Sequence, residues 1–470
     1  MKNFIIVITF LVLTNPGTAQ TIEKKLAQAV AQFETDPQLR HAILSVCVTD
    51  AATGKQVYAH HAQIGLAPAS TQKILTSVAA FDLLGNNFRF ATYIGHDTDI
   101  KNGELPGDLF IIGKGDPTFG SWRWKSTTDT AILHQLITIL QQRGIRKIKG
   151  NIWLDDFQFT HQPVPEGWIW QDMGNYYGAG CWSMNWRENQ YDLVLASGAC
   201  CGDLTSIVKT VPELPGLSLT NFIRVDKKGS GDNGYIFTAP YSTVGFTTGT
   251  IPAEEKKFTI SGSLPYPSKV FARELEQKLG NSGVQFSNKI NLYSQFVAEH
   301  TPVRRATMIL DSIQSPTLDS INYWFLRRSI NLYGEALVKM IAYKKTGLGN
   351  TDVGVELVKD FWGARGIDKG AINIMDGSGL SPQNRVTTDA LVKVLQYART
   401  RPWYASFYKA MPEYNGMKMK SGSVGGARAF TGYHTAKNGK QYTYAIIVNN
   451  YDGSSGEVVK KMYKVLDVLK

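Results

Sequence analysis

The chain has 470 residues, 43% of them hydrophobic and 19% charged, which is a globular composition with too many residues for one ordinary core. Its formal net charge is +11. The lysines and arginines are scattered, however, and no zinc-finger spacing or basic-region motif indicates a nucleic-acid partner. We therefore expect two or three domains with a mildly basic surface, which would suit anionic polymers.

Residues 1–19 have the pattern of a secretory signal. Lys2 supplies a positive start, residues 4–13 are apolar, and Gly17 to Ala19 form a small-residue cleavage site. The apolar run is too short to span a bilayer, no later segment is long and apolar enough to do so, and no cysteine follows the site to carry a lipid anchor. We expect an exported protein without a transmembrane segment, whose mature chain begins at Gln20.

The first motif that carries chemistry is Ser70 with Lys73, directly after Pro68. Apolar residues at helical spacing follow as far as Gly85, which predicts a helix whose first turn holds Ser70. Because positions i and i+3 share a helix face, Lys73 should reach the Ser70 hydroxyl and could activate it as a nucleophile. Alone this pair is weak evidence, since a capped helix with a surface lysine has the same pattern.

Other segments give a coarse plan of the chain. Strands are expected at residues 43–48, 56–58, 148–154 and 442–449, and helices at 130–142, 319–328 and 331–343. Residues 218–265 are rich in strand and turn signals, and the glycines at 113–115 fit a plain loop better than a phosphate loop. The aromatic-rich stretch at 168–189 is either a wall that binds a polymer or a packed loop, and composition favours packing.

Cysteines and histidines add little to this plan. An exported chain could join Cys181 to Cys200 or Cys201, whereas the alternative is that all the cysteines are free, with Cys47 in a buried strand. The histidines show no metal-ligand spacing, and His60 and His61 would point to opposite faces of a strand. We therefore expect no metal site and no cofactor.

Two later motifs complete a set with Ser70 and Lys73. They are Ser329-Ile330-Asn331, between two predicted helices, and Lys420-Ser421-Gly422, at the start of a predicted strand. Ser-x-x-Lys, Ser-Asp-Asn and Lys-Thr-Gly are the signature of β-lactamases and penicillin-binding proteins. This chain has them in this order, with Ser-Ile-Asn as the second motif and Lys-Ser-Gly as the third. The long separation of Ser70 from Ser329 leaves room for inserted domains.

With the run Asp376-Gly-Ser-Gly-Leu-Ser381, Gly115 to Thr118, and residues 168–189 and 331–337, the chain resembles the penicillin-binding protein 4 family. These are low-molecular-mass class C D-alanyl-D-alanine carboxypeptidases and endopeptidases. The resemblance covers nearly all of the mature chain. It implies a mixed α/β fold, in which a penicilloyl-serine transferase domain has an antiparallel sheet flanked by helices. That domain would comprise residues 20–90 and 300–470, interrupted by a β-rich domain at 91–117 and 196–299 and a nested one at 118–195.

The resemblance and the chemistry of the residues assign roles in the same way. Ser70 would attack the peptide carbonyl and a neutral Lys73 would take its proton, which requires burial or a neighbouring cation. Lys420 could supply that second charge and hold the terminal carboxylate of the substrate. Ser329 would relay a proton, and Asn331 would hydrogen-bond the substrate backbone. Ser421 and Gly422 would contact the substrate. The backbone N–H groups of Ser70 and Ser423 would form the oxyanion hole.

The family's pair of residues for binding the substrate side chain matches Asp172 and Tyr177. In the family, an arginine commonly follows the run that here is Asp376–Ser381, but this chain has Pro382 at that position. Asp172 would bind the amine of a diamino acid, and the carboxylate of that side chain would be either unclamped or reached by Arg385.

The resemblance implies a periplasmic serine-type D-Ala-D-Ala carboxypeptidase and DD-endopeptidase. Its partners would be peptidoglycan stem peptides, with β-lactam antibiotics as covalent inhibitors. Two other interpretations stand beside it: a β-lactamase or esterase on the same fold, which the long insertion disfavours, and a catalytically inactive wall-binding protein, which the intact motifs disfavour.

Overall fold

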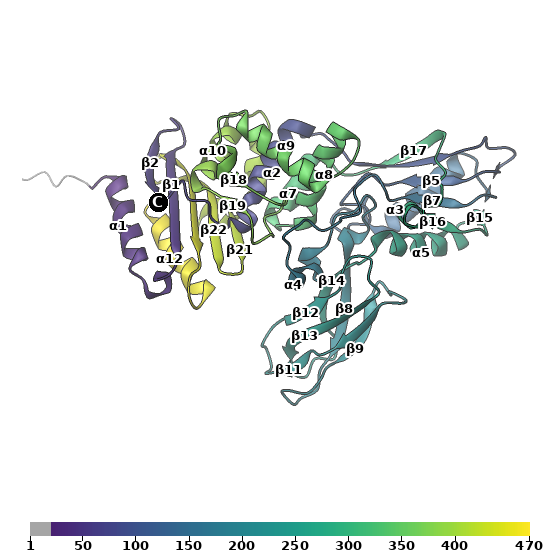
Figure 1. The fold of residues 1–470 in the computed structure, drawn as a ribbon, viewed down its shortest axis with the longest axis horizontal. Coiled ribbons are helices and arrows are strands. Elements are labelled where there is room, and N and C mark those ends of the chain that lie inside the picture. Colours follow the sequence, from purple (N-terminus) through teal and green to yellow (C-terminus); the bar gives the residue numbers. More distant parts are fainter. Residues whose placement is uncertain (1–19) are drawn as a thin grey trace, which may run out of the picture.

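The computed structural model describes residues 20–470, so the predicted signal at 1–19 lies outside the described residues. The fold is mixed α/β, as expected. A body built on one antiparallel sheet carries two smaller lobes (Figure 1). Across residues 20–470, no helix combines the length and the apolar character needed to cross a membrane.

The body is organised around a six-stranded antiparallel sheet to which both ends of the described chain contribute. Its order is β2-β1-β23-β22-β21-β20, so N-terminal strands pair with C-terminal ones. The strands are β1 (Ile43–Asp50), β2 (Gln56–His60), β20 (Glu413–Tyr414), β21 (Met417–Val424), β22 (Ala427–Thr435) and β23 (Gln441–Asn449). The strands predicted at 43–48, 56–58 and 442–449 are confirmed.

Each face of this sheet packs on helices, as the alternation of side chains along a strand requires. In β1, Leu44, Val46 and Val48 join a core with α1 (Ile22–Glu34) and α12 (Ser455–Asp467). Cys47 faces the opposite core. The helices of that core are α2 (Lys73–Leu84), α7 (Leu318–Arg327), α8 (Asn331–Thr346), α9 (Thr351–Gly363), α10 (Thr388–Arg399) and α11 (Tyr404–Ala410).

The first lobe, at the right of Figure 1, has a five-stranded sheet of order β16-β7-β5-β3-β17. Apolar side chains of α3 (Asp129–Gln142) and α5 (Pro267–Gly280) form its core with the sheet. The strands are β3 (Ala91–His96), β5 (Leu109–Ile112), β7 (Ile152–Asp155), β16 (Ile290–Leu292) and β17 (Met308–Gln314).

The second lobe, at the bottom of Figure 1, consists of two small sheets around their own apolar core. One sheet pairs β14 (Phe258–Ser263), β8 (Gln190–Ala196) and β9 (Ser206–Val211). The other pairs β10 (Ser218–Asn221), β13 (Val244–Pro252), β11 (Arg224–Asp226) and β12 (Asn233–Phe237).

The strand pairings divide the inserted residues differently from the expected ranges. β7 and α3, expected in a nested domain at 118–195, belong with β5 in the first lobe. β17 pairs with β3, so the first lobe extends past the expected return to the body at residue 300. The nested unit is instead the β-rich segment that begins at β8. Composition located the β-rich segment. It could not show which strands, distant in the sequence, pair to form each lobe.

Candidate active site

Ser70 lies on a tight 3-10 turn, Ala69–Gln72, that leads into α2. The prediction of a helix after Ser70 is confirmed, although Ser70 itself precedes the α-helical part. Ala69 has φ of +46°, a left-handed conformation that costs an L-residue about 1–2 kcal/mol. Gly379 packs on this turn so closely that a Cβ there would lie 2.1 Å from the Ala69 carbonyl oxygen. The surrounding loops therefore hold the serine in a strained turn, which is common at functional sites.

Lys73 is fully buried, and its ammonium nitrogen has three oxygen partners. Nζ lies 2.9 Å from Ser70 Oγ, 2.6 Å from Asn331 Oδ1 and 2.7 Å from the Ser378 carbonyl oxygen. Burial lowers the pKa of Lys73 to about 7, although the negative charges of Asp376 and Glu335 oppose this effect. A lysine with this pKa is partly neutral at neutral pH and in reach of the serine proton.

Ser329 and Asn331 lie where α7 ends and α8 begins, as the sequence predicted. Ser329 also has a left-handed backbone, with φ of +56°, and its side chain faces the cleft. Asn331 accepts from Lys73 and donates from Nδ2 to the Tyr177 carbonyl oxygen at 2.7 Å. The Asn331 amide thus joins the buried lysine to the aromatic-rich residues 168–189, called the inserted segment below.

The third motif lies on β21 and packs against the serine turn. A Cβ on Gly422 would lie 2.4 Å from the Pro68 carbonyl oxygen, so only glycine lets β21 approach this closely. Lys420 is buried, and its Nζ donates to the Ser421 carbonyl oxygen at 2.7 Å. Burial, and then the charge of Lys73, hold the pKa of Lys420 well below its usual range.

The Asp376–Ser381 loop holds the base in position. The Asp376 carboxylate accepts hydrogen bonds from Trp168 Nε1 at 2.8 Å and from the Gly379 N–H at 2.8 Å. Glu335, buried on α8, accepts from the Gly377 N–H at 3.0 Å. Burial, together with the charge of Asp376, raises the pKa of Glu335 to about 8. Sequence reasoning missed Glu335 as a site residue, because a glutamate inside a helix gives no signal of its own.

A cleft of about 750 Å³ opens beside Ser70. The body lines it with Ser70, Ser329, Asn331, Ser421 and Ser423, whereas Lys73, Lys420 and Gly422 do not line it.

The inserted segment also lines the cleft, with Asp172, Tyr176 and Tyr177. Burial raises the pKa of Asp172, and a hydrogen bond from the Tyr177 hydroxyl acts against this. The Tyr177 pKa is also raised by burial and by the nearby Asp172 charge. The predicted pair is therefore together and lines the same cleft as Ser70.

Arg385 lies apart from these lining residues. Its guanidinium donates to the Pro382 and Asn384 carbonyl oxygens at 2.7 and 2.8 Å. Arg328 and Arg428, which sequence reasoning did not single out, line the cleft instead. Arg428 was detectable only as a basic residue eight positions after Lys420, and pairing of β21 with β22 brings it opposite Ser423.

The aromatic-rich stretch is packed, as its composition favoured, and two of its tyrosines also line the cleft. Trp168, Trp182 and Trp186 are buried, whereas Tyr176 and Tyr177 line the cleft. The stretch is thus a packed segment that also presents one wall to the cleft.

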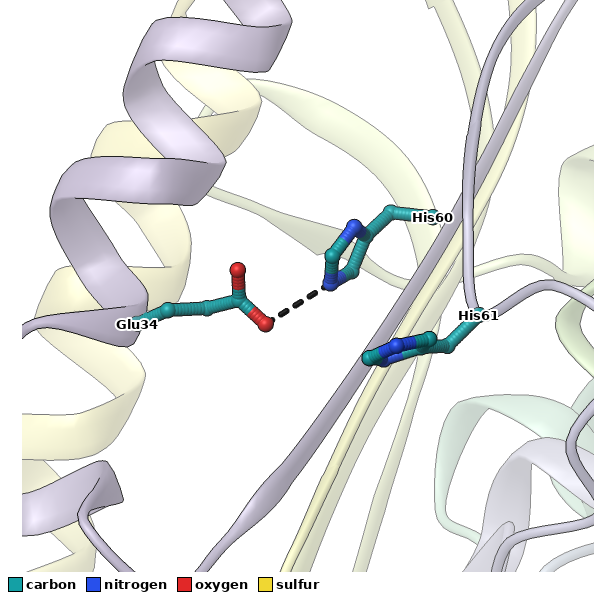
Figure 2. Close-up of side chains that lie close together, drawn as sticks. All are labelled: Glu34, His60 and His61. Atoms are coloured by element: carbon teal, nitrogen blue, oxygen red, sulfur yellow. Dashed lines mark hydrogen bonds and ion pairs between the residues drawn. The ribbon is translucent and has the colours of Figure 1, made fainter.

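The cysteines are all free, so a bridge from Cys181 is not formed. Cys181 is buried while Cys200 and Cys201 are exposed, and Cys47 lies buried in β1 as expected. The prediction for the adjacent histidines is wrong: the rings of His60 and His61 lie together, with centroids 4.1 Å apart (Figure 2).

Comparisons with known proteins bear on the family and the fold. The model of the D-Ala-D-Ala carboxypeptidase 3 (S13) family matches residues 26–413. A D-alanyl-D-alanine carboxypeptidase of Actinomadura sp. (strain R39) is 25% identical, over 91% of this chain and 82% of that protein. The crystal structure of penicillin binding protein 4 from Haemophilus influenzae has a TM-score of 0.78 at 20% identity, over 93% of this chain and 98% of that one.

A second structure of that protein, complexed with a novel β-lactam, has a TM-score of 0.74 at 19% identity, over 94% of this chain and 98% of that one. These matches confirm the resemblance and the fold that it implied. The family model covers most of the chain and spans its first two motifs. The chain therefore belongs to the D-Ala-D-Ala carboxypeptidase 3 (S13) family.

Proposed function

We propose that this protein hydrolyses D-Ala-D-Ala stem peptides and peptide crosslinks of peptidoglycan through an acyl-enzyme on Ser70, and that β-lactams acylate the same serine. The observation that carries the proposal is the buried Lys73 amine, 2.9 Å from Ser70 Oγ, with its pKa lowered to about 7. The family and the β-lactam complex of the Haemophilus influenzae protein support the substrate and the inhibitor class.

Acylation begins when neutral Lys73 takes the Ser70 hydroxyl proton and the serine oxygen bonds to the carbonyl carbon of the penultimate D-alanine. The Asn331 and Ser378 oxygens keep Nζ in place and stabilise it once it is protonated. The amide C–N bond then breaks, and the leaving amine receives a proton. Ser329, on its left-handed turn at the cleft, is our candidate for passing that proton on.

The oxyanion is assigned to the backbone N–H groups of Ser70 and Ser423. The close packing of Gly422 on Pro68 supports this assignment, because it brings β21 against the serine turn. Loss of one such donor typically lowers the rate by about 10²–10³. Water then attacks the ester carbonyl, releases the shortened peptide and restores the Ser70 hydroxyl.

Lys420 is assigned to the terminal carboxylate of the substrate. Its pKa is depressed by burial and by Lys73, so an ammonium at this point is costly until an anion comes near. A substrate carboxylate favours the charged form, since opposite charges stabilise each other. Binding of the carboxylate and protonation of Lys420 would thus be coupled. Ser421 lines the cleft beside it, and Gly422 keeps β21 packed on the serine turn.

The inserted wall is assigned to recognition of the stem's diamino acid. Asp172 can bind its amine in a charge-assisted hydrogen bond, a type that contributes about 1.5–3 kcal/mol. We assign the carboxylate of that side chain to Arg328 or Arg428, because they line the cleft and Arg385 does not. A leaving group as large as a neighbouring stem fits an open cleft, which supports endopeptidase action beside carboxypeptidase action.

Peptidoglycan lies outside the cytoplasm, so the proposed activity requires export to the periplasm. Terminal sequencing of the exported protein tests the mature start at Gln20, and an intact Met1 there would contradict it.

The function is tested by intact mass and by chromatography of muropeptides. Penicillin should add one adduct to the wild type and none to Ser70→Ala, and the wild type should cut both pentapeptide stems and crosslinked dimers. An adduct that survives Ser70→Ala would remove this serine from its role. Rapid turnover of penicillin without any cleavage of muropeptides would instead identify a β-lactamase.

A further inference from the structure

A cluster of three metal-ligand side chains lies where α1 meets the edge strand β2 (Figure 2). Glu34 is the last residue of α1, His60 is the last of β2, and His61 follows it. One ligand atom from each comes within 4.8 Å of the other two. Among residues 20–470, no other three such side chains meet this closely.

The backbone explains why adjacent histidines point the same way. Successive side chains of a strand alternate between its faces, but His61 has φ of +50°. This left-handed residue ends the alternation and brings its ring beside that of His60, with both rings directed toward Glu34 (Figure 2). Histidine tolerates this conformation better than most residues.

The hydrogen bonds of the two histidines leave a nitrogen of each ring available to bind a metal. His61 Nδ1 lies 3.2 Å from the Leu44 carbonyl oxygen, so Nδ1 carries the proton and Nε2 keeps its lone pair. Such a bond from the second ring nitrogen is usual for histidine ligands and fixes the ring. His60 Nε2 and Glu34 Oε1, 2.7 Å apart, share a proton that a dication would displace.

We propose that Glu34, His60 and His61 bind a transition-metal dication, for which Zn²⁺ is the best fit. Two imidazole nitrogens and one carboxylate oxygen are a common zinc set, completed by water. Ligand atoms about 2.0–2.2 Å from a tetrahedral ion lie about 3.4 Å from each other. His60 and Glu34, now 2.7 Å apart, therefore need to separate slightly, and the His61 ligand atom lies within 4.8 Å of both.

The surroundings suit a bound ion. The His60 and Glu34 side chains are 23% and 37% exposed, which gives the ion an entry path and leaves room for water. The nitrogen ligands disfavour Ca²⁺ and Mg²⁺, which prefer oxygen. Because Glu34 belongs to α1 and the histidines lie at the end of β2, the ion would tie the first described helix to the edge of the sheet.

The test is zinc binding by calorimetry and equilibrium dialysis at neutral pH. Exposed Cys200 and Cys201 could bind zinc on their own, so the reference protein carries Cys200→Ser and Cys201→Ser. We expect one Zn²⁺ per chain and a higher melting temperature with zinc, since a ligand that binds only the folded state stabilises it. Co²⁺ in place of Zn²⁺ should give the visible absorption of a four-coordinate site.

Substitutions of the three ligand residues test whether zinc binds at this site. His60→Gln, Glu34→Gln and His61→Asn should each weaken zinc binding more than tenfold and abolish the thermal shift. Asparagine is chosen at 61 because it too tolerates a left-handed backbone. His134→Ala, an exposed histidine on α3, is the matched control and should bind zinc as the reference does.

Circular dichroism and the melting temperature without zinc confirm that each variant is folded. No zinc bound by the folded reference protein would overturn the proposal. Equal affinity in the folded ligand variants would also overturn it, because the contact would then be a plain surface ion pair.

Discussion

Lys73 should set the pH dependence of Ser70 acylation. Burial lowers its pKa to about 7, and only the neutral amine can accept the serine proton. The rate should therefore rise with pH and level off above the pKa. A group with this pKa is about one-tenth neutral at pH 6 and about nine-tenths at pH 8, so acylation at pH 6 should be about tenfold slower than at the plateau.

Asn331→Asp tests the cause of that profile. It places a carboxylate where an amide oxygen now lies 2.6 Å from Lys73 Nζ. An adjacent opposite charge favours the ammonium and typically moves a pKa by about 1–3 units, so the profile should shift toward alkaline pH. Acylation at pH 7 should then fall at least fivefold by this shift alone, a rough estimate from the same range.

The assay is the second-order rate constant for acylation by a fluorescent penicillin, measured from pH 5.5 to 9. The ratio of rates at two pH values separates a pKa shift from a uniform loss, which the broken bond to the Tyr177 carbonyl would cause. A flat profile in the wild type, or an unshifted profile in folded Asn331→Asp, would refute Lys73 as the base.

Three other substitutions test separate parts of the cleft. Lys73→Ala should slow acylation by about 10²–10⁴, the usual contribution of a positioned base, in the same penicillin assay. Gly422→Ala should slow acylation and cost about 1–3 kcal/mol of stability by thermal unfolding, because the new Cβ would lie 2.4 Å from the Pro68 carbonyl oxygen. Asp172→Ala should lose about tenfold to a hundredfold on stems with a free side-chain amine, measured on purified muropeptides, with little change toward penicillin. Equal slowing of both substrates would make Asp172 structural.

The local parts of the site could be predicted from the sequence. Spacing alone puts Lys73 beside Ser70, and the break between two helical segments locates Ser329 and Asn331. These predictions hold because they depend on helix geometry over a few residues.

The remaining features depend on contacts between distant segments. Asn331 donates to the Tyr177 carbonyl, and Gly422 packs on Pro68. Neither contact has a local pattern in the sequence. The histidine prediction failed for a local reason, because strand alternation was assumed through His61, whose left-handed backbone ends it.

The contact between Asn331 and Tyr177 also bears on how substrate choice could reach the chemistry. Asn331 holds the base through its oxygen and the inserted wall through its nitrogen, at 2.6 and 2.7 Å. Tyr177 in turn lies near Asp172, our candidate for the amine of the stem, and burial and then the charge of Asp172 raise the pKa of Tyr177. We therefore expect a substrate that engages Asp172 to act on the segment that fixes Asn331, and through it on the position of the Lys73 amine. Penicillins carry no diamino-acid side chain to engage Asp172. The rate at which they acylate Ser70 therefore depends on Lys73 without any effect of binding at Asp172.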